Sequence, residues 1–475
     1  MPPTHATHAT HATHAWQMTA EALSQAFARR TLSPVEALLS VLGQADAVHP
    51  RLNALVVRDD AAALAAAQAS EERWHRGAPL SPLDGVPLTV KDNIPVAGLP
   101  CRWGSRLFAD HRPARDESPV ARLRAGGMVI LGKTNVPEFT LQGYTDNPLF
   151  GPTGNPWAPA LTPGGSSGGA VAAVAAGIGP LALGTDGGGS IRRPCGFTGL
   201  YGFKPGRGVV PRADGLPVLL PGLEEAGPIA RSMGDLQLAL RLLAPGLAPL
   251  AHRPGPLRIA CWRAIGDSPV DAAILARSDA AAERLRALGH TVVEQPSLPE
   301  VEAFNRQAWP VIASTGLAAV LRGHPDGAER QLSPALAGLL AQGRAHTAVD
   351  LFQAQALQRA LAKALQGLFG QHDLLLTPAS AALPWPADES HPGTIAGRPV
   401  DGRGHAVFTA FVNGAGLPAL ALPAGPTDDG LPVGLQLVAP RGGDALLCAV
   451  GVMYEREAAP AWCWPPALDK EEMPS

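Results

Sequence analysis

The chain of 475 residues carries 38 Lys and Arg against 41 Asp and Glu, a formal net charge of -3. Charges so nearly balanced argue against a basic nucleic-acid surface or a polybasic membrane patch, and they favour a small neutral or weakly charged ligand. The length would accommodate two or three average domains, although large α/β enzymes often use it for one compact unit.

The chain begins with a repeat of Thr, His and Ala. We expect residues 1–16 to form a disordered tail, because small polar repeats cannot bury enough surface to fold. Weak metal binding by the histidines of this tract is the alternative. A basic segment followed by an apolar stretch, as in a secretory signal, is not found, and the odd number of scattered cysteines favours reduced thiols. These features predict a cytoplasmic protein.

Helix and strand signals then alternate along the chain. Residues 33–36, Ser-Pro-Val-Glu, combine a helix cap, a proline at the first helical position and a glutamate at the third, so they predict a helix start. An alanine-rich helix is expected over residues 60–74. Residues 86–90 have the apolar character of a core strand, and Lys91 stands at the end of that strand.

The stretch GMVILGKT, residues 127–134, fits the pattern of a phosphate-binding loop. Such a loop turns its backbone N–H groups inward and usually needs small, permissive residues. Here the positions between the two glycines hold Met, Val, Ile and Leu. We therefore expect a buried strand over residues 128–131, ended by Gly132, and no nucleotide site.

Residues 161–185 contain no charged side chain. Their serines, prolines and glycines argue against a membrane span, because lipid offers no partner for a broken backbone. We expect a buried helix followed by a buried strand over residues 181–184. With the strands before them, these elements predict an α/β sheet with helices on its faces.

The composition changes at residues 245–382, which are rich in alanine and leucine. This pattern predicts helices, with strand-like runs at 257–261 and 291–294. We expect this segment to be a helical cap or insertion that shapes a substrate pocket on a core formed by the two ends. The closing segment, residues 416–440, returns to strands and tight turns. A flexible linker between independent domains is not evident.

Two glycine-rich stretches lie close together, TPGGSSGGA at residues 162–170 and GTDGGGSIRRP at residues 184–194. Such density marks backbone that approaches another group closely or adopts positive φ, and either stretch alone is equally well a tight turn. The first contains G-x-S-x-G, the pattern of a nucleophile elbow. The prolines before it do not form the central strand that an elbow requires.

A serine hydroxyl needs a positioned base to act as a nucleophile, and a lysine can be that base where burial favours its neutral form. Lys91 is a candidate because it ends an apolar strand. A lone lysine is more often a surface or salt-bridged residue, so this feature alone does not decide.

Taken together, Lys91 within PLTVKDNI, Ser166 within GGSSGG and Ser190 within GTDGGGSIRRP, with their spacing, resemble the amidase signature family. The resemblance runs from about residue 20 to about residue 460. It implies one large α/β domain over residues 17–465, with a central mixed, mostly parallel twisted sheet covered by helices on both faces, and a C-terminal tail over residues 466–475. It also implies that GMVILGKT is scaffold.

The family chemistry, carried over to matching positions, makes Ser190 the nucleophile, with Ser166 between it and a neutral Lys91. An acyl-enzyme would form and water would release the acid. The resemblance further implies an oxyanion hole made by the backbone N–H groups of Gly187, Gly188, Gly189 and Ser190, where side chains would block the carbonyl oxygen.

Other residues have supporting or substrate-binding roles in this interpretation. Asp186 would brace the glycine loop or cap a helix, and Ser167 would order its turn. Thr140 and Tyr144 lie in a segment that resembles the acyl-binding side. Arg193 stands where many relatives have an uncharged residue; a surface ion pair is the favoured explanation, and a grip on a substrate carboxylate is the alternative.

Three functions remain open at this stage. The leading one is a stand-alone amidase that acts on a small-molecule amide without metal or cofactor. Its rival is the glutamine-hydrolysing subunit of a tRNA-dependent amidotransferase, which typically resembles GSDTGGSIRQPA at the nucleophile. The third is an inactive binding relative. The amide that is cleaved, esterase activity and a homodimeric state are not readable from the sequence.

Overall fold

The computed structural model describes residues 14–248, 254–324 and 327–468. Most of the predicted N-terminal tail, including His5, His8 and His11, therefore lies outside the described residues. The predicted tail is too long, because Ala15–Gln17 forms a 3-10 turn whose Trp16 packs on a core cluster. At the other end, Pro466–Leu468 forms a further 3-10 turn, so the fold also continues past residue 465.

Eleven strands of the described chain form one sheet, in the order β1-β3-β2-β4-β6-β5-β12-β13-β9-β7-β8, and β10 pairs with β11 apart from it. The strands are β1 Leu55–Arg58, β2 Pro87–Lys91, β3 Val129–Thr134, β4 Leu181–Asp186, β5 Tyr201–Lys204, β6 Glu225–Ala230, β7 Arg258–Cys261, β8 Thr291–Glu294, β9 Leu374–Pro378, β10 Thr394–Ile395, β11 Arg398–Pro399, β12 Ala419–Pro426 and β13 Pro432–Val438.

The sheet is mixed, as expected. Its parallel pairs are β2 with β3 and β4, and β7 with β8 and β9, and the remaining six pairs are antiparallel. Antiparallel pairs thus outnumber parallel ones, which departs from the mostly parallel sheet that the sequence predicts. The reason lies in the C-terminal half, where a tight turn makes β12 and β13 a hairpin and antiparallel pairing continues on both sides.

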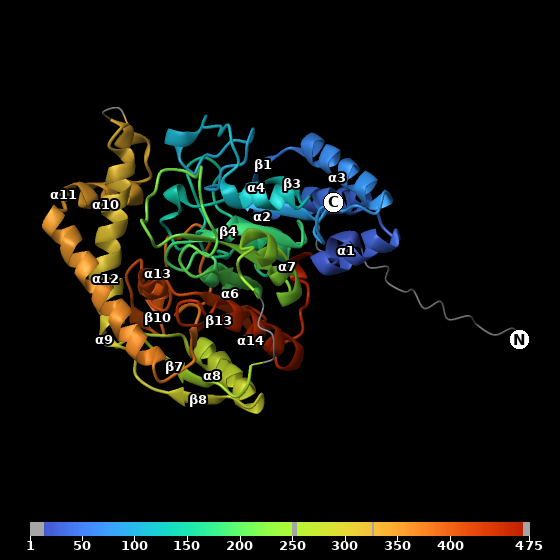
Figure 1. Ribbon diagram of the computed structural model, residues 1–475. Helices are drawn as coiled ribbons and strands as arrows, with labels where there is room; N and C mark the ends of the chain where they lie inside the picture. Colours follow the sequence, from blue (N-terminus) through green and yellow to red (C-terminus); the bar gives the residue numbers. More distant parts are fainter. Residues whose placement is uncertain (1–13, 249–253, 325–326, 469–475) are drawn as a thin grey trace, which may run out of the picture.

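Helices flank the sheet on both faces (Figure 1). They are α1 Ala20–Arg29, α2 Pro34–Leu52, α3 Asp60–His75, α4 Ser118–Ala125, α5 Gly168–Ala175, α6 Arg192–Thr198, α7 Met233–Leu243, α8 Ala272–Ala287, α9 Pro299–Ala303, α10 Trp309–Leu321, α11 Pro334–Ala345, α12 Ala348–Phe369, α13 Ala410–Ala415 and α14 Asp444–Glu457. Within the described chain, none of these helices is both long and apolar enough to cross a membrane.

Local sequence explains several of these elements. The predicted start of α2 is confirmed, because Ser33 and Glu36 form a reciprocal capping box. Strand β3 is longer than expected, since Gly132 lies inside it instead of ending it. A Cβ atom at Gly132 would collide with the carbonyl oxygen of Val57 on the neighbouring β1. The glycine therefore permits close pairing of the two strands, and no phosphate-binding loop exists here.

Strand β4 shows how the core is organised. Leu181 and Leu183 belong to the main core cluster on one face, and Ala182 belongs to a second cluster with Val171 and Val174 of α5. Side chains alternate across a strand, so β4 is buried on both faces between α7 and α5. This explains its uninterrupted apolar sequence and confirms the predicted buried helix and strand.

The segment predicted as a helical cap, residues 245–382, has two parts. It contributes β7, β8 and β9 to one end of the sheet, so this portion belongs to the core. Helices α9 to α12 stand together beside the sheet, at the yellow and orange side of Figure 1. The chain therefore forms a single α/β domain, and only the second part resembles a cap.

Candidate active site

The ends of two neighbouring strands position the candidate residues. β2 and β4 run parallel, with Val90 opposite Leu183. Because the carboxyl ends of parallel strands lie at the same edge of a sheet, Lys91 and Asp186 emerge together there. The loop that carries Ser166 leads into α5, which packs on both strands.

Lys91 and Ser166 are in direct contact. Lys91 is fully buried, and its Nζ lies 2.8 Å from Ser166 Oγ. Nζ also donates to the carbonyl oxygen of Thr185 at 3.1 Å and lies 3.0 Å from Thr185 Oγ1. Ser166 is the serine of the G-x-S-x-G pattern, and its hydroxyl meets a lysine, unlike the serine of an elbow triad, which meets a histidine.

The surroundings of Lys91 favour its neutral form. Burial is the largest influence on Lys91; together with the charges of Arg212 and Arg193, and against those of Glu224 and Asp186, it lowers the pKa to about 7. In the part of the chain that the structure describes, no carboxylate lies within ion-pair distance of Nζ. The alternative of a surface or salt-bridged lysine is therefore wrong for this residue.

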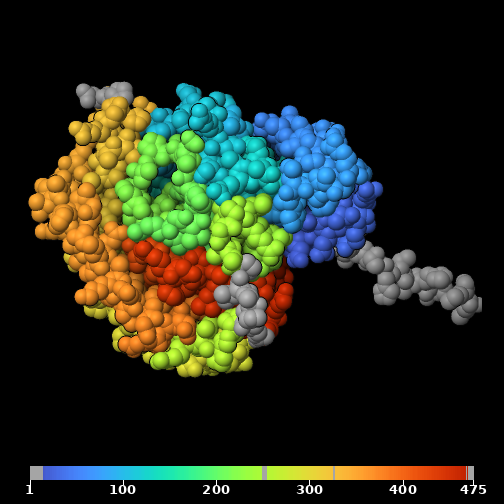
Figure 2. Space-filling view, in the orientation of Figure 1, coloured from blue at the N-terminus to red at the C-terminus, as the bar shows by residue number. Residues whose placement is uncertain are grey.

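Ser190 lies in the turn between β4 and α6 and lines a cavity of about 50 Å³. Its carbonyl oxygen accepts a hydrogen bond of 3.2 Å from the Ser167 N–H, which joins the two glycine-rich stretches. Its walls come from segments that are distant in sequence: residues 140–143, Gly187, Gly188, Arg193, Leu220, Glu224, Trp309, Gly402, Arg403, His405 and Ala406. Teal, green and yellow segments meet around a hollow in the face shown in Figure 2.

Asp186 braces the turn that carries Ser190. Its carboxylate accepts hydrogen bonds from the N–H groups of Gly189 at 2.7 Å and Ile191 at 3.1 Å, and it pairs with the Arg192 guanidinium at 2.8 Å. Burial alone would raise the pKa of Asp186, but Arg192 outweighs it and holds that pKa well below its usual range. These backbone hydrogen bonds join the carboxylate to the turn.

The glycines of this turn have different roles. The N–H of Gly189 is bonded to Asp186, and Gly189 adopts a φ of 115° where a Cβ would collide with Arg193 and Thr409. The N–H groups of Gly187, Gly188 and Ser190 donate to no other group of the described chain, and these three residues line the cavity. The predicted four-donor set is thus reduced to three.

Comparison with known proteins identifies the family. A family model described as Amidase matches residues 36–448. The chain belongs to the amidase family. As a member of this family it is a hydrolase that acts on amide C–N bonds.

Individual relatives of the amidase family divide between two kinds of protein. A glutamyl-tRNA(Gln) amidotransferase subunit of Chloroflexus aggregans is 34% identical over 92% of this chain and 96% of its own length. The indoleacetamide hydrolase of Bradyrhizobium diazoefficiens is 32% identical over 93% and 87%. A bacterial aryl acylamidase of the amidase signature enzymes superimposes with a TM-score of 0.86 at 29% identity, over 93% and 96%.

Arg193 differs from the surface ion pair that the sequence favours. It is buried, and its Nη atoms donate to the Gly188 carbonyl, to Thr409 Oγ1 at 2.8 Å and to the Gly165 carbonyl at 3.3 Å. No carboxylate of the described residues pairs with it. Arg192 and Arg193 are successive residues of a helix, so their side chains diverge by about 100°. Arg192 forms the ion pair with Asp186, and Arg193 lines the cavity.

The other predicted residues are placed as follows. Thr140 lines the cavity, whereas Tyr144 does not, and its backbone packs against Gly165. Ser167 donates its hydroxyl to the Thr185 carbonyl at 3.2 Å, in line with a role in ordering the turn. Cys195, five residues after Ser190, is buried, and burial raises the pKa of its thiol well above the usual range.

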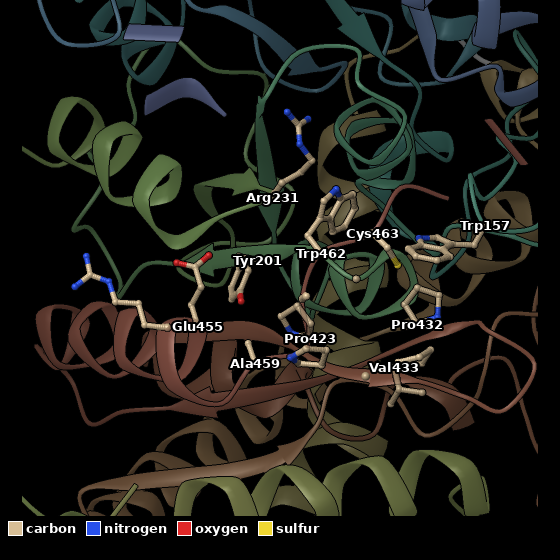
Figure 3. Close-up of a pocket in the computed structure, with 16 residues that line it drawn as sticks. Trp157, Tyr201, Arg231, Pro423, Pro432, Val433, Glu455, Ala459, Trp462 and Cys463 are labelled. Atoms are coloured by element: carbon tan, nitrogen blue, oxygen red, sulfur yellow. The ribbon is translucent and has the colours of Figure 1, made fainter. Parts of the chain in front are cut away.

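A second, larger cavity lies at the opposite end of the sheet (Figure 3). It has a volume of about 370 Å³ and includes Trp157, Tyr201, Glu455 and Trp462 among its walls. Tyr201 pairs with Ala230, which is also opposite Leu181 at the beginning of β4, far from Asp186 at its end. Neither Lys91 nor either candidate serine reaches this cavity, so its size does not make it the catalytic site.

Sequence reasoning missed Trp309, Arg403 and His405, which line the same cavity as Ser190. Arg403 and His405 lie in a short Gly-rich turn whose sequence has no periodic or motif signal. Trp309 begins α10 and reads as an ordinary core residue. The sequence predicts no metal ligation, and among the described residues no three His, Cys, Asp or Glu side chains are grouped to hold an ion.

Proposed function

We propose that this protein is a stand-alone amidase that hydrolyses a carboxylic amide to an acid and ammonia or an amine, through an acyl-enzyme on Ser190. The observation that carries the proposal is the buried contact of 2.8 Å between Lys91 Nζ and Ser166 Oγ beside the Ser190 turn. A lysine whose pKa is lowered toward neutral pH can act as a general base, and at this distance it can accept the proton of the Ser166 hydroxyl.

The hydrogen bonds of Lys91 support a relay. A neutral amine has two N–H groups and one lone pair, and Thr185 offers two acceptors, its carbonyl oxygen and its Oγ1. The lone pair then faces Ser166 Oγ. Lys91 takes the proton of Ser166 as Ser166 takes that of Ser190, and Ser190 Oγ bonds to the amide carbon.

The same relay completes the reaction in reverse. The proton passes back through Ser166 to the leaving nitrogen, the C–N bond breaks and an acyl-enzyme remains on Ser190. Water then gives its proton to the relay and attacks the acyl carbon. The relay returns that proton to Ser190 Oγ as the bond between Ser190 and the acyl carbon breaks, and the acid leaves. The N–H groups of Gly187, Gly188 and Ser190 are the proposed donors to the oxyanion, and loss of one such donor typically costs about 10²- to 10³-fold in rate.

The amidotransferase subunit is the second candidate, because relatives of that name match most of this chain. Two features favour the free enzyme. Where that subunit has Thr and Gln in GSDTGGSIRQPA, this chain has Gly187 and Arg193. A Cβ at position 187 would lie 2.5 Å from the Leu220 Cδ1 methyl, so a larger residue there would need that side chain to shift. Arg193 occupies the cavity itself.

The substrate pocket is proposed to include part of the helical segment, because Trp309 of α10 lines the cavity and its indole N–H donates to the Gly187 carbonyl at 3.3 Å. Thr140 is a further pocket residue in this proposal. A cytoplasmic location and independence from a partner protein likewise remain predictions.

The test is release of ammonia or amine from aliphatic, aromatic and carboxylate-bearing amides, with glutamine included, by wild type and Ser190→Ala. We expect turnover of at least one amide that disappears in Ser190→Ala, and labelling of wild type alone by a serine-reactive probe. Turnover of glutamine only, and only with added partner proteins, would favour the amidotransferase. Absence of both turnover and labelling would favour an inactive relative.

A further inference from the structure

Arg403 has an unusual position at the catalytic cavity. Its guanidinium carbon lies 3.7 Å from the centre of the Trp309 ring, a cation–π contact that holds the group flat. Its guanidinium makes no hydrogen bond or ion pair with any residue that the structure describes. The side chain lines the Ser190 cavity and also a neighbouring cavity of about 410 Å³. Its donors are therefore available at the boundary between the two.

Arg193 is a second cation in the same cavity without an acidic partner. Its three hydrogen bonds go to two carbonyls and a hydroxyl, and its buried Nε has none. Burial lowers the pKa of Arg193; the charge of Asp186 opposes this, and the charges of Arg403 and Arg192 act with burial, so the two cavity cations lie close enough to repel each other. Two guanidinium groups that share one cavity and form no ion pair within the described chain are costly unless an anion joins them.

The acidic groups near this pair form no ion pair with it among the described residues. Asp186 is paired with Arg192. Burial lowers the pKa of Arg403, and the charge of Asp401 opposes this but Asp401 does not bond to the guanidinium. Glu224 also lines the cavity, but its carboxylate is engaged by Arg212 at 2.7 Å. Burial, followed by Arg193 and Arg403, lowers the pKa of His405 well below its usual range, so this imidazole is neutral. The arginines elsewhere in the site are satisfied, since Arg192 pairs with Asp186.

We propose that the substrate is a primary amide whose acyl part carries a carboxylate, a half-amide of a short dicarboxylic acid, with the carboxylate bound by Arg403 and Arg193. This inference rests on the proposed amidase function. Ser190, the free N–H groups and both arginines line one small cavity, so the reacting carbonyl and the anion share it. A planar guanidinium held on a ring is suited to a carboxylate.

The test compares each half-amide with its isosteric diamide: malonamate with malonamide, succinamate with succinamide, and glutaramate with glutaramide. Wild type should prefer the half-amide at one chain length or more by at least about tenfold in kcat/KM. Arg403→Gln should reduce that preference about 10- to 100-fold, which corresponds to a hydrogen bond with a charged group. Arg193→Gln should reduce it in the same direction.

Arg359→Gln is the matched control, because Arg359 also stacks on an aromatic ring, Phe352, but on the exposed side of α12. It should leave the preference unchanged. A second measurement is calorimetric binding of the preferred half-amide to Ser190→Ala, with and without Arg403→Gln. Binding should weaken at least about tenfold in the double variant, while thermal unfolding checks that it is folded.

The outcomes separate the two proposals. Hydrolysis of diamides that depends on Ser190, without a preference for half-amides, would overturn the carboxylate inference and leave the amidase function intact. Equal losses on both members of a pair in Arg403→Gln would also overturn it. If no amide is hydrolysed in a Ser190-dependent way, the amidase function itself fails. If the half-amides also fail to bind Ser190→Ala, the carboxylate inference fails too.

Discussion

Lys91 and Lys133 stand at the ends of adjacent strands, β2 and β3, and differ in what burial does to them. Both side chains are fully buried, and Val90 is paired with Lys133 in the sheet. Nζ of Lys133 forms an ion pair of 3.2 Å with buried Asp92, whereas Lys91 meets a serine and a threonine. Two lysines in nearly the same place thus have different chemical surroundings.

The electrostatic consequence is opposite in the two cases. Burial opposes the charged form of both, but for Lys133 the influence of Cys101 and Asp92 outweighs it and raises the pKa. For Lys91 burial prevails and lowers the pKa to about 7. Depth alone therefore does not create a base; a buried amine without a carboxylate does.

The largest expected effect is that of Lys91→Met on catalysis. It should lower kcat by about 10³-fold, because a general base typically contributes 10²- to 10⁴-fold. Steady-state ammonia release is the measurement, with thermal unfolding to confirm a folded protein. Retention of more than about a tenth of the wild-type kcat would show that Lys91 is not the base.

Lys133→Met should affect folding instead. Removal of one partner of a buried ion pair leaves Asp92 uncompensated and typically costs about 3–5 kcal/mol of unfolding free energy. Urea unfolding gives that value, and Lys91→Met should lose less. Adding Asp92→Asn to Lys133→Met should recover part of the stability. If Lys133→Met is as stable as wild type, the ion pair with Asp92 does not stabilise the fold, and the proposed difference between the two lysines is wrong.

Parts of this comparison are readable from the sequence. The capped start of α2, the apolar strand before Lys91 and the two glycine-rich stretches follow from local rules, and the family resemblance indicates Lys91, Ser166 and Ser190. The structure then brings Lys91 into contact with Ser166. The sequence places Lys133 in a phosphate-loop pattern, but its pairing with Asp92 depends on the alignment of two strands.

Other parts require tertiary geometry. The direction of the Gly189 N–H depends on a φ of 115°, which the letters GGG do not specify. The sequence favours a surface position for Arg193 because arginine is usually exposed, yet the neighbouring Arg192 takes the available carboxylate. Arg403 meets Trp309 only because the turn at residues 402–406 packs against α10, far away in sequence.

The pH dependence of catalysis is a smaller effect that sharpens the comparison. Lys91 acts as a base when neutral, so kcat/KM should reach its plateau by about pH 8, stand at about half of it at pH 7 and fall to about a tenth of it at pH 6. Lys133 cannot produce this limb, because its pKa is raised. Rates measured between pH 5.5 and 8.5 decide, with circular dichroism to confirm folding at each pH. A flat profile would contradict the assignment.

Ser167→Ala is expected to have the smallest effect. It tests whether Ser167 contributes to catalysis through the Thr185 carbonyl that it shares with Lys91, or takes no part. The Thr185 carbonyl accepts from Lys91 Nζ and also from Ser167 Oγ. Loss of one neutral hydrogen bond costs about 1 kcal/mol, so kcat/KM should fall less than about tenfold, with the same pH limb. Ser166→Ala is the control and should lose about 10³-fold, because it interrupts the relay. Comparable losses in the two variants would mean that Ser167, too, takes part in proton transfer.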